Sequence, residues 1–190
     1  MLGNIIINKV EGSVMVNGEV NMQKGLVEYL ACSSRGKIHE SVLKLDVEPY
    51  YLQIALLLIG LEPAGTTDVH QGEVAAIDGD PMEIWVRWKG KNNRPIKIRA
   101  EKLILNLATK KPLEEMNWMF TGSQIMDDRF MAQREQSIVA IYHDPFAILD
   151  HPRKIGADDT LFYANTDLLP AAGTFVDFIV IRKGHILNIH

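Results

Sequence analysis

The densest run of side chains that could do chemistry spans residues 32–41, Cys-Ser-Ser-Arg-Gly-Lys-Ile-His-Glu-Ser, between two predicted strands. It contains a nucleophile in Cys32 or a serine, a base in His39 and a carboxylate in Glu40. Nucleophilic catalysis needs the base within hydrogen-bond reach of the nucleophile, with an orienting group behind the base. Neighbouring strand residues point to opposite faces, so we expect His39 and Ser41 on one face and Glu40 on the other. One hypothesis is therefore a hydrolase-like or metal-assisted site at these three residues.

The same run also has a structural interpretation. Turns between strands often use His and Ser side chains to satisfy backbone groups. A lone Cys in an apolar strand is usually a small core residue, which favours packing over catalysis for Cys32. Under this interpretation the loop can still bind a ligand, through Lys37 and His39.

A metal site is the second hypothesis. The six histidines show no helical pair with an acid between them, so there is no HExxH-type motif. His143-Asp144-Pro145 and Asp150-His151-Pro152 bracket a short apolar stretch, and their ends could converge on a divalent cation. The alternative is that these Asp-Pro and His-Pro pairs open turns. The candidate metal ligands are thus His143, Asp144, Asp150 and His151, and no other cofactor is predicted.

A predicted hairpin over 82–88 and 95–99 is the better candidate for binding. One face should be core, with Ile84, Val86, Trp88, Ile96 and Ile98. The other face carries Trp85, Arg87, Lys89, Lys97 and Arg99. A tryptophan among cations can stack on planar groups and attract phosphate or carboxylate. The alternative is a solvated sheet face on which a neighbouring segment covers Trp85.

The elements that must position these residues are mostly strands. We expect strands over 25–32 and 41–47, with later ones near 118–120, 137–142, 147–149 and 174–181, and a hairpin turn at Asn17-Gly18. Pro49 and Gly60 bound the clearest helix, which is apolar all round and is therefore predicted to be a buried core helix. Residues 100–107 are expected to begin as a helix. The pattern indicates a single α+β domain over 1–190, with an antiparallel or mixed sheet and few helices.

Composition excludes several classes of function. The net charge of −4 argues against nucleic acid as a partner. One Cys cannot ligate an iron–sulfur cluster or a multi-Cys zinc site. The P-loop, GxGxxG and GxSxG motifs are absent from the sequence. The start lacks the basic region of a signal peptide, and the longest apolar run is too short to span a membrane.

The chain resembles the YdjY-type domain family from about residue 10 onward. The resemblance lies in 25–29, in the Gly36-Lys-Ile-His-Glu-Ser41 run, which is its most specific part, and in the Pro49–Gly60 helix. It continues through 118–123, 137–145, 169–170 and 173–174. The resemblance implies a largely uncharacterised family, many of whose members look exported or lipid-anchored, so an exported protein whose leader was trimmed is one expectation. Some members carry an iron–sulfur label, which Cys32 alone does not support.

These observations favour a non-enzymatic binding or accessory domain. It would engage a small ligand or a protein through the His39 loop or the Trp85 face. The enzyme with His39, Glu40 and Ser41 is the rival hypothesis. A third is a module whose copies associate through exposed strand edges.

Overall fold

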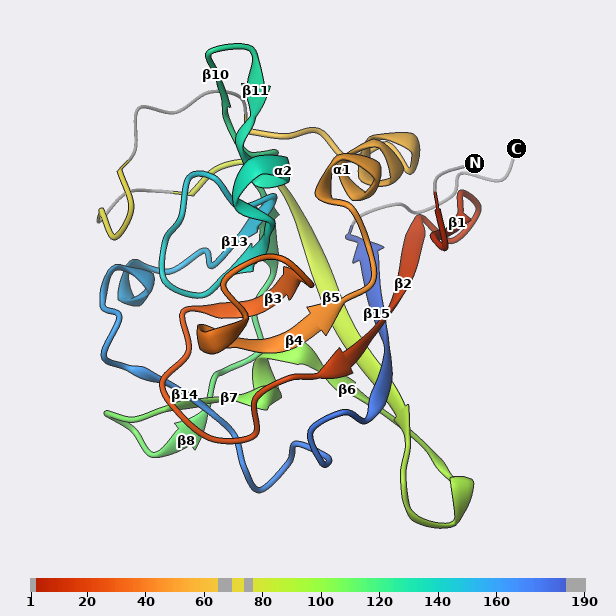
Figure 1. Cartoon of the computed structure of the whole chain (residues 1–190), viewed down its shortest axis with the longest axis vertical. Coiled ribbons are helices and arrows are strands. Elements are labelled where there is room, and N and C mark those ends of the chain that lie inside the picture. Colours follow the sequence, from red (N-terminus) through yellow and green to blue (C-terminus); the bar gives the residue numbers. More distant parts are fainter. Residues whose placement is uncertain (1–2, 65–69, 74–76, 184–190) are drawn as a thin grey trace.

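The computed structural model describes residues 3–64, 70–73 and 77–183, and their main feature is a closed sheet (Figure 1). Its path runs through β2, β15, β5, β9, β13, β12, β3 and β4, and the pairing of β4 with β2 closes it into a barrel of eight strands. These strands are β2 (Ser13–Val20), β15 (Phe175–Arg182), β5 (Asp80–Lys89), β9 (Trp118–Phe120), β13 (Leu149–Asp150), β12 (Ser137–Ala140), β3 (Tyr29–Ser33) and β4 (Ser41–Leu45).

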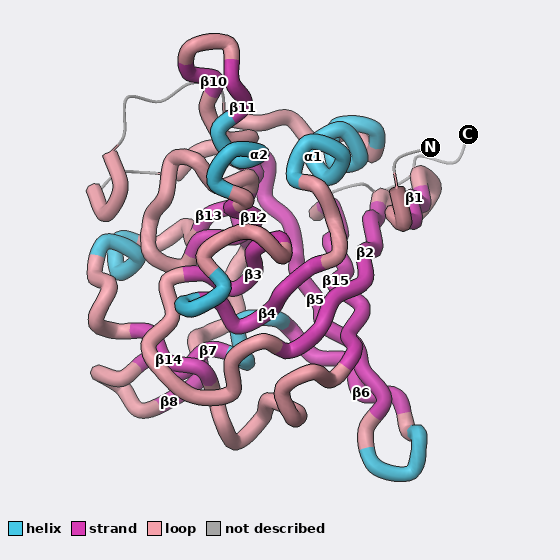
Figure 2. Tube along the Cα trace, in the orientation of Figure 1, coloured by secondary structure: helices cyan, strands magenta, loops and turns pink. Residues whose placement is uncertain are grey.

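Shorter elements surround the barrel (Figure 2). β1 (Ile6–Asn8) pairs with β2, and β6 (Pro95–Arg99) pairs with β5. A second sheet contains β14 (Phe162–Ala164), β7 (Ile104–Asn106) and β8 (Lys111–Pro112), and β10 (Ile125–Met126) pairs with β11 (Arg129–Phe130). The helices are α1 (Pro49–Leu58) and α2 (Met131–Glu135), with 3-10 turns η1 (Ile38–Glu40), η2 (Lys91–Asn93), η3 (Ala100–Leu103) and η4 (Lys154–Ala157).

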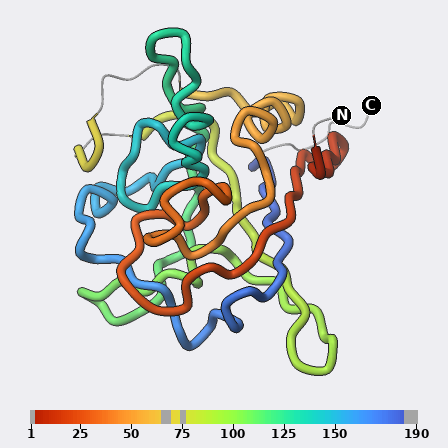
Figure 3. Tube along the Cα trace, in the orientation of Figure 1, coloured from red at the N-terminus to blue at the C-terminus, as the bar shows by residue number. Residues whose placement is uncertain are grey.

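Alternation of apolar and polar residues explains the long strands. In β5, Met82, Ile84, Val86 and Trp88 are buried, whereas Arg87 and Lys89 are exposed. β15 pairs antiparallel with β5 on one side and with β2 on the other, so the first and last long strands lie side by side (Figure 3). The pairs β3–β4 and β12–β13 are parallel. The predicted strand-rich, mixed sheet with few helices is confirmed.

Strands β3 and β12 differ, because every residue in them is buried. Their buried residues include polar ones, Tyr29, Ser33 and Ser137. β3 and β12 therefore bury side chains that could do chemistry.

The expectation of a buried core helix over 49–60 is wrong. α1 buries Pro49, Leu52, Ala55 and Leu56, and it exposes Tyr50, Tyr51, Leu57 and Leu58. Figure 1 shows α1 at the periphery, outside the barrel. The closed sheet fills its own interior with side chains, so no space remains there for a helix. Apolar composition all round a helix therefore failed here as a guide to its position.

The predicted hairpin turn at Asn17-Gly18 is also wrong, because both residues lie within β2. Gly18 pairs with Val176 of β15 and with Leu45 of β4. A Cβ on Gly18 would lie 2.6 Å from Leu45 Cδ2 and 2.7 Å from the Lys44 carbonyl oxygen. The glycine serves the close approach of β4 rather than a turn. Residues 100–107 likewise begin with only the single turn η3 before β7.

Gly18→Ala should destabilise the protein by about 1–3 kcal/mol, because the added methyl group has no room against the β4 backbone. Urea unfolding measures the change. The control is Asn17→Ala at the exposed neighbouring position, which should stay within about 0.5 kcal/mol of the unchanged protein. Equal stability of the two variants would contradict this account of barrel closure.

Candidate functional site

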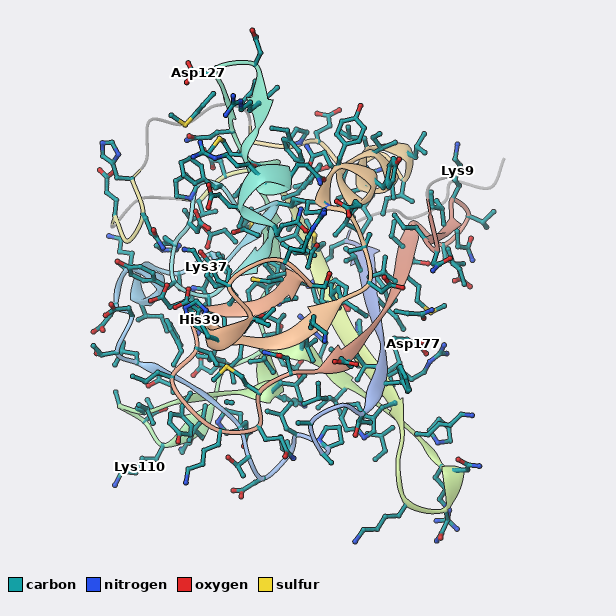
Figure 4. The ribbon with its side chains drawn as sticks, in the orientation of Figure 1. Lys9, Lys37, His39, Lys110, Asp127 and Asp177 are labelled. Carbon is teal, nitrogen blue, oxygen red and sulfur yellow. The ribbon has the colours of Figure 1, made fainter. Side chains whose placement is uncertain are left out.

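The His39 loop follows β3 as η1 and lies on the surface. Figure 4 shows Lys37 and His39 near each other. The His39 side chain is 77% exposed, with Nε2 3.6 Å from Glu40 Oε2. Ser41 is fully buried, and its hydroxyl donates to the Leu43 carbonyl at 2.8 Å. The structure therefore brings His39 beside Glu40 but leaves the Ser41 hydroxyl engaged elsewhere.

Cys32 belongs to the buried surface of β3. Burial raises the pKa of its thiol to about 12, so the thiol is protonated at neutral pH. The thiolate is the nucleophilic form of cysteine, and this environment disfavours it. The interpretation of Cys32 as a core residue agrees with this geometry.

A chain of polar contacts, which the residue pattern did not predict, connects the His39 loop to the interior. Lys37 Nζ donates to the Tyr29 hydroxyl at 2.9 Å, and that hydroxyl donates to Asp144 Oδ2 at 2.7 Å. Burial, then the Asp144 carboxylate, raises the pKa of Tyr29, which keeps the phenol neutral. Asp144 Oδ1 also accepts from the Phe146 backbone N–H at 2.9 Å. Tyr29 thus joins two of the candidates, Lys37 and Asp144, which are far apart in sequence.

The expected convergence of the two His- and Asp-containing turns is present. His143 Nδ1 lies 3.1 Å from Asp150 Oδ1, which also accepts from the His151 backbone N–H at 2.6 Å. Asp150 Oδ2 accepts from the Asp144 backbone N–H at 3.3 Å. The parallel pairing of β12 with β13 causes this meeting, because it brings the carboxyl ends of both strands to one edge. Asp144 is the exception, since its carboxylate faces Tyr29.

This cluster lies in a desolvated part of the protein. His143, Asp150 and His151 are each at most 2% exposed. Burial raises the pKa of Asp150 and lowers the pKa of His151. Within the described ranges, no group of three or more His, Cys, Asp or Glu side chains is arranged to hold a metal ion. The divalent metal therefore stays a prediction.

On the Trp85 face, two of the predicted cations lie over the Trp85 ring. Lys97 Nζ lies 5.0 Å from the Trp85 ring centroid, and Arg99 Cζ lies 5.5 Å from it. Arg99 is buried, however, and it pairs with Glu101 Oε1 at 2.6 Å and with Glu83 Oε1 at 3.2 Å. Two carboxylates therefore already neutralise this guanidinium, so Arg99 is a structural ion-pair residue rather than a free ligand-binding cation.

The opposite face of the hairpin requires a second correction. Ile96 was expected in the core but is 38% exposed, and Ile98 is only partly buried. The end of the β5–β6 hairpin projects beyond the barrel (Figure 2), so its apolar residues lack a sheet to pack against. Only the barrel end of the hairpin contributes fully buried residues.

A groove lies beside this projecting hairpin. Its volume is about 1120 Å³, and β2, β4, β5, β6 and β15 all contribute to its lining. Phe175 in the lining is 82% exposed. Two ion pairs also line the groove. Arg87 Nη2 lies 2.8 Å from Asp177 Oδ2, and Lys44 Nζ lies 2.6 Å from Glu19 Oε1. Sequence reasoning missed the groove, because its lining comes from five strands that are far apart in the sequence.

Tyr29→Phe should lower the free energy of unfolding by about 1–3 kcal/mol, because it leaves the buried Asp144 carboxylate without its phenol donor. Equilibrium urea unfolding measures the loss. Tyr50→Phe, which alters an exposed tyrosine on α1, is the matched control and should change little. If Tyr29→Phe were as stable as the control, the Lys37–Tyr29–Asp144 chain would not tie the loop to the barrel.

Comparison with known proteins gives one match. The family model of the YdjY domain matches residues 5–181. No curated protein and no solved structure matches. Within the described residues, no helix is long and apolar enough to cross a bilayer. The matched region includes the barrel strands up to Ile181 of β15 and all the candidate residues described above, and the chain belongs to the YdjY domain family.

Proposed function

We propose that this protein is a non-catalytic binding domain that engages an acidic segment of a partner protein. The binding surface is the cationic arm, which we define as residues 84–100 of β5, η2 and β6, together with the groove at its base. The observation that carries the proposal is the charge of the arm. It contains six Lys and Arg residues and no Asp or Glu.

The charge is concentrated against an acidic background. The rest of the chain has 14 Lys and Arg against 24 Asp and Glu, a formal charge of −10. Of the six arm cations, Arg87 and Arg99 form ion pairs. The other four, Lys89, Lys91, Arg94 and Lys97, are exposed and have no acidic partner in the part of the chain that the structure describes. Such separation of charge attracts and orients an anionic partner.

The groove supplies the apolar part of the surface. Phe175 is exposed beside Lys89 and Arg87, and so an occupant can bury an apolar side chain while its acidic groups face the arm. A volume of about 1120 Å³ in an open groove exceeds the roughly 300–1,000 Å³ usual for small-molecule pockets. This size favours an extended segment of a protein over a compact metabolite.

The enzymatic hypothesis has no comparable support. His39 is exposed on η1, Ser41 is buried with its hydroxyl bonded to a backbone carbonyl, and Cys32 holds its proton at neutral pH. A nucleophile within reach of a base is what acyl-transfer chemistry requires. The described contacts of these three residues do not include such a pair, so the enzyme at His39, Glu40 and Ser41 stays a prediction.

The test is a charge reversal in the arm. Lys89→Glu, Lys91→Glu and Arg94→Glu are combined, and binding of a labelled peptide of alternating Glu and Leu is followed by fluorescence anisotropy. The affinity should fall at least about tenfold because three attractive charges become repulsive. The unchanged protein should bind this peptide more weakly as salt is raised.

The matched control reverses three exposed lysines elsewhere, Lys9, Lys110 and Lys111. Figure 4 shows Lys9 and Lys110 away from the arm, and Lys111 follows Lys110 at the start of β8. This control should bind the peptide like the unchanged protein. Phe175→Ser should weaken binding of the Glu–Leu peptide but not of a peptide of alternating Glu and Ser. Equal binding by the arm variant and the lysine control would reject the proposal.

A further inference from the structure

Two buried histidines share an unusual feature. His143 and His151 are 1% and 0% exposed, and the Nε2 atom of each has no hydrogen-bond partner among the described residues. Their ring centroids are 6.2 Å apart. A buried polar nitrogen without a partner destabilises the fold, and two adjacent ones require an explanation.

The other ring nitrogen of each histidine is held in place. His143 Nδ1 faces the Asp150 carboxylate at 3.1 Å, and His151 Nδ1 lies 3.1 Å from the Arg153 carbonyl oxygen. Histidines that bind metal ions usually donate the second N–H to a carboxylate or a backbone carbonyl, which leaves Nε2 as the free donor atom. The Arg153 backbone N–H also lies 3.1 Å from His151 Nδ1, and the ring tautomer decides between the two contacts.

The distance between the rings fits an ion between them. A metal–nitrogen bond of about 2 Å, with roughly 1 Å more from nitrogen to ring centre, gives about 6 Å between the centroids when two imidazoles lie on opposite sides of one ion. The 6.2 Å separation agrees with this arrangement. Hydrogen bonds to backbone amides and His143 occupy both Asp150 oxygens, so this carboxylate orients the site rather than adding a ligand.

The residues around His143 and His151 indicate which metal ion their two nitrogen atoms would bind. Structural zinc takes four protein ligands, and no third His, Cys, Asp or Glu joins the pair in the described ranges. Imidazole is a good copper ligand, and monovalent copper is stable with two ligands. Trp118 and Phe162 pack on His151 with ring centroids 6.2 and 5.8 Å away, which excludes water and favours an ion of low charge.

We propose that His143 and His151 form a two-histidine site for monovalent copper, with Asp150 and the Arg153 carbonyl as positioning groups. The site is independent of the arm and of the partner proposed above. Gly156 in η4 covers the His143 ring, because a Cβ at this position would lie 2.6 Å from His143 Cε1. This turn packs against the His143 ring, and the glycine leaves the ring room to hold its orientation.

The experiment is competition for copper under anaerobic conditions, with ascorbate as reductant and bicinchoninate as the coloured chelator. The full chain should withdraw one equivalent of copper from the chelator. His143→Gln and His151→Gln should each weaken this withdrawal at least about tenfold, since either removes half of the ligands. Gly156→Ala, which keeps both histidines but crowds one ring, should also weaken it.

Thermal unfolding supplies a second measurement that does not depend on the chelator. Copper should raise the melting temperature of the unchanged protein and not that of the His143 and His151 variants. His39→Gln and Cys32→Ser, which alter an exposed histidine and the single thiol, should retain copper fully. The proposal is overturned if the unchanged protein takes up no copper, if Cys32→Ser abolishes uptake, or if zinc binds as tightly as copper.

Discussion

The double pairing of β2 is the constraint on which the rest of the structure depends. Its first part pairs with β15, and from Gly18 onward it also pairs with β4, which converts an open sheet into a closed one. Closure removes two strand edges and lets the interior fill with side chains from all eight strands. The segment of β2 around Gly18 also lines the groove, together with residues of β4 and β15. Barrel closure and the proposed binding surface therefore share the same part of β2.

Strands β3 and β12 show how the closed sheet buries polar side chains. β3 and β12 are covered on both faces, and so their polar neighbours need partners within the protein. Lys37, Tyr29 and Asp144 satisfy one another in a chain, and Asp150 satisfies His143 and two backbone amides. Among the described residues, the two imidazole Nε2 atoms, the Ser137 hydroxyl of β12 and the Trp118 indole N–H have no such partner. The run from Gly36 to Ser41 supplies Lys37 to this network, which gives that residue a structural role.

Burial also determines which charged residues of the β5–β6 hairpin have partners. Where the arm joins the barrel, Arg99 is buried and neutralised by Glu83 and Glu101, because a buried charge without partners would destabilise the fold. Towards the tip the cations are exposed, and hydration removes this requirement. One strand pair therefore contains both a structural ion pair and the free cations available to a partner. Both groups consist of Lys and Arg residues. The structural cation lies next to the barrel, whereas the free cations lie farther from it.

The sequence by itself determined several of the long strands and the limits of the chemistry. Alternation of apolar residues located β5, β6 and β15, and the single cysteine excluded thiolate clusters. The Asp150-His151 and His143-Asp144 pairs predicted a convergence that β12 and β13 produce. Only the tertiary structure decided the position of α1, the role of Gly18, the partners of Arg99 and the link from Lys37 through Tyr29 to Asp144. Each of these depends on which strands lie next to one another after closure, and a local pattern of residues contains no information about partners distant in sequence.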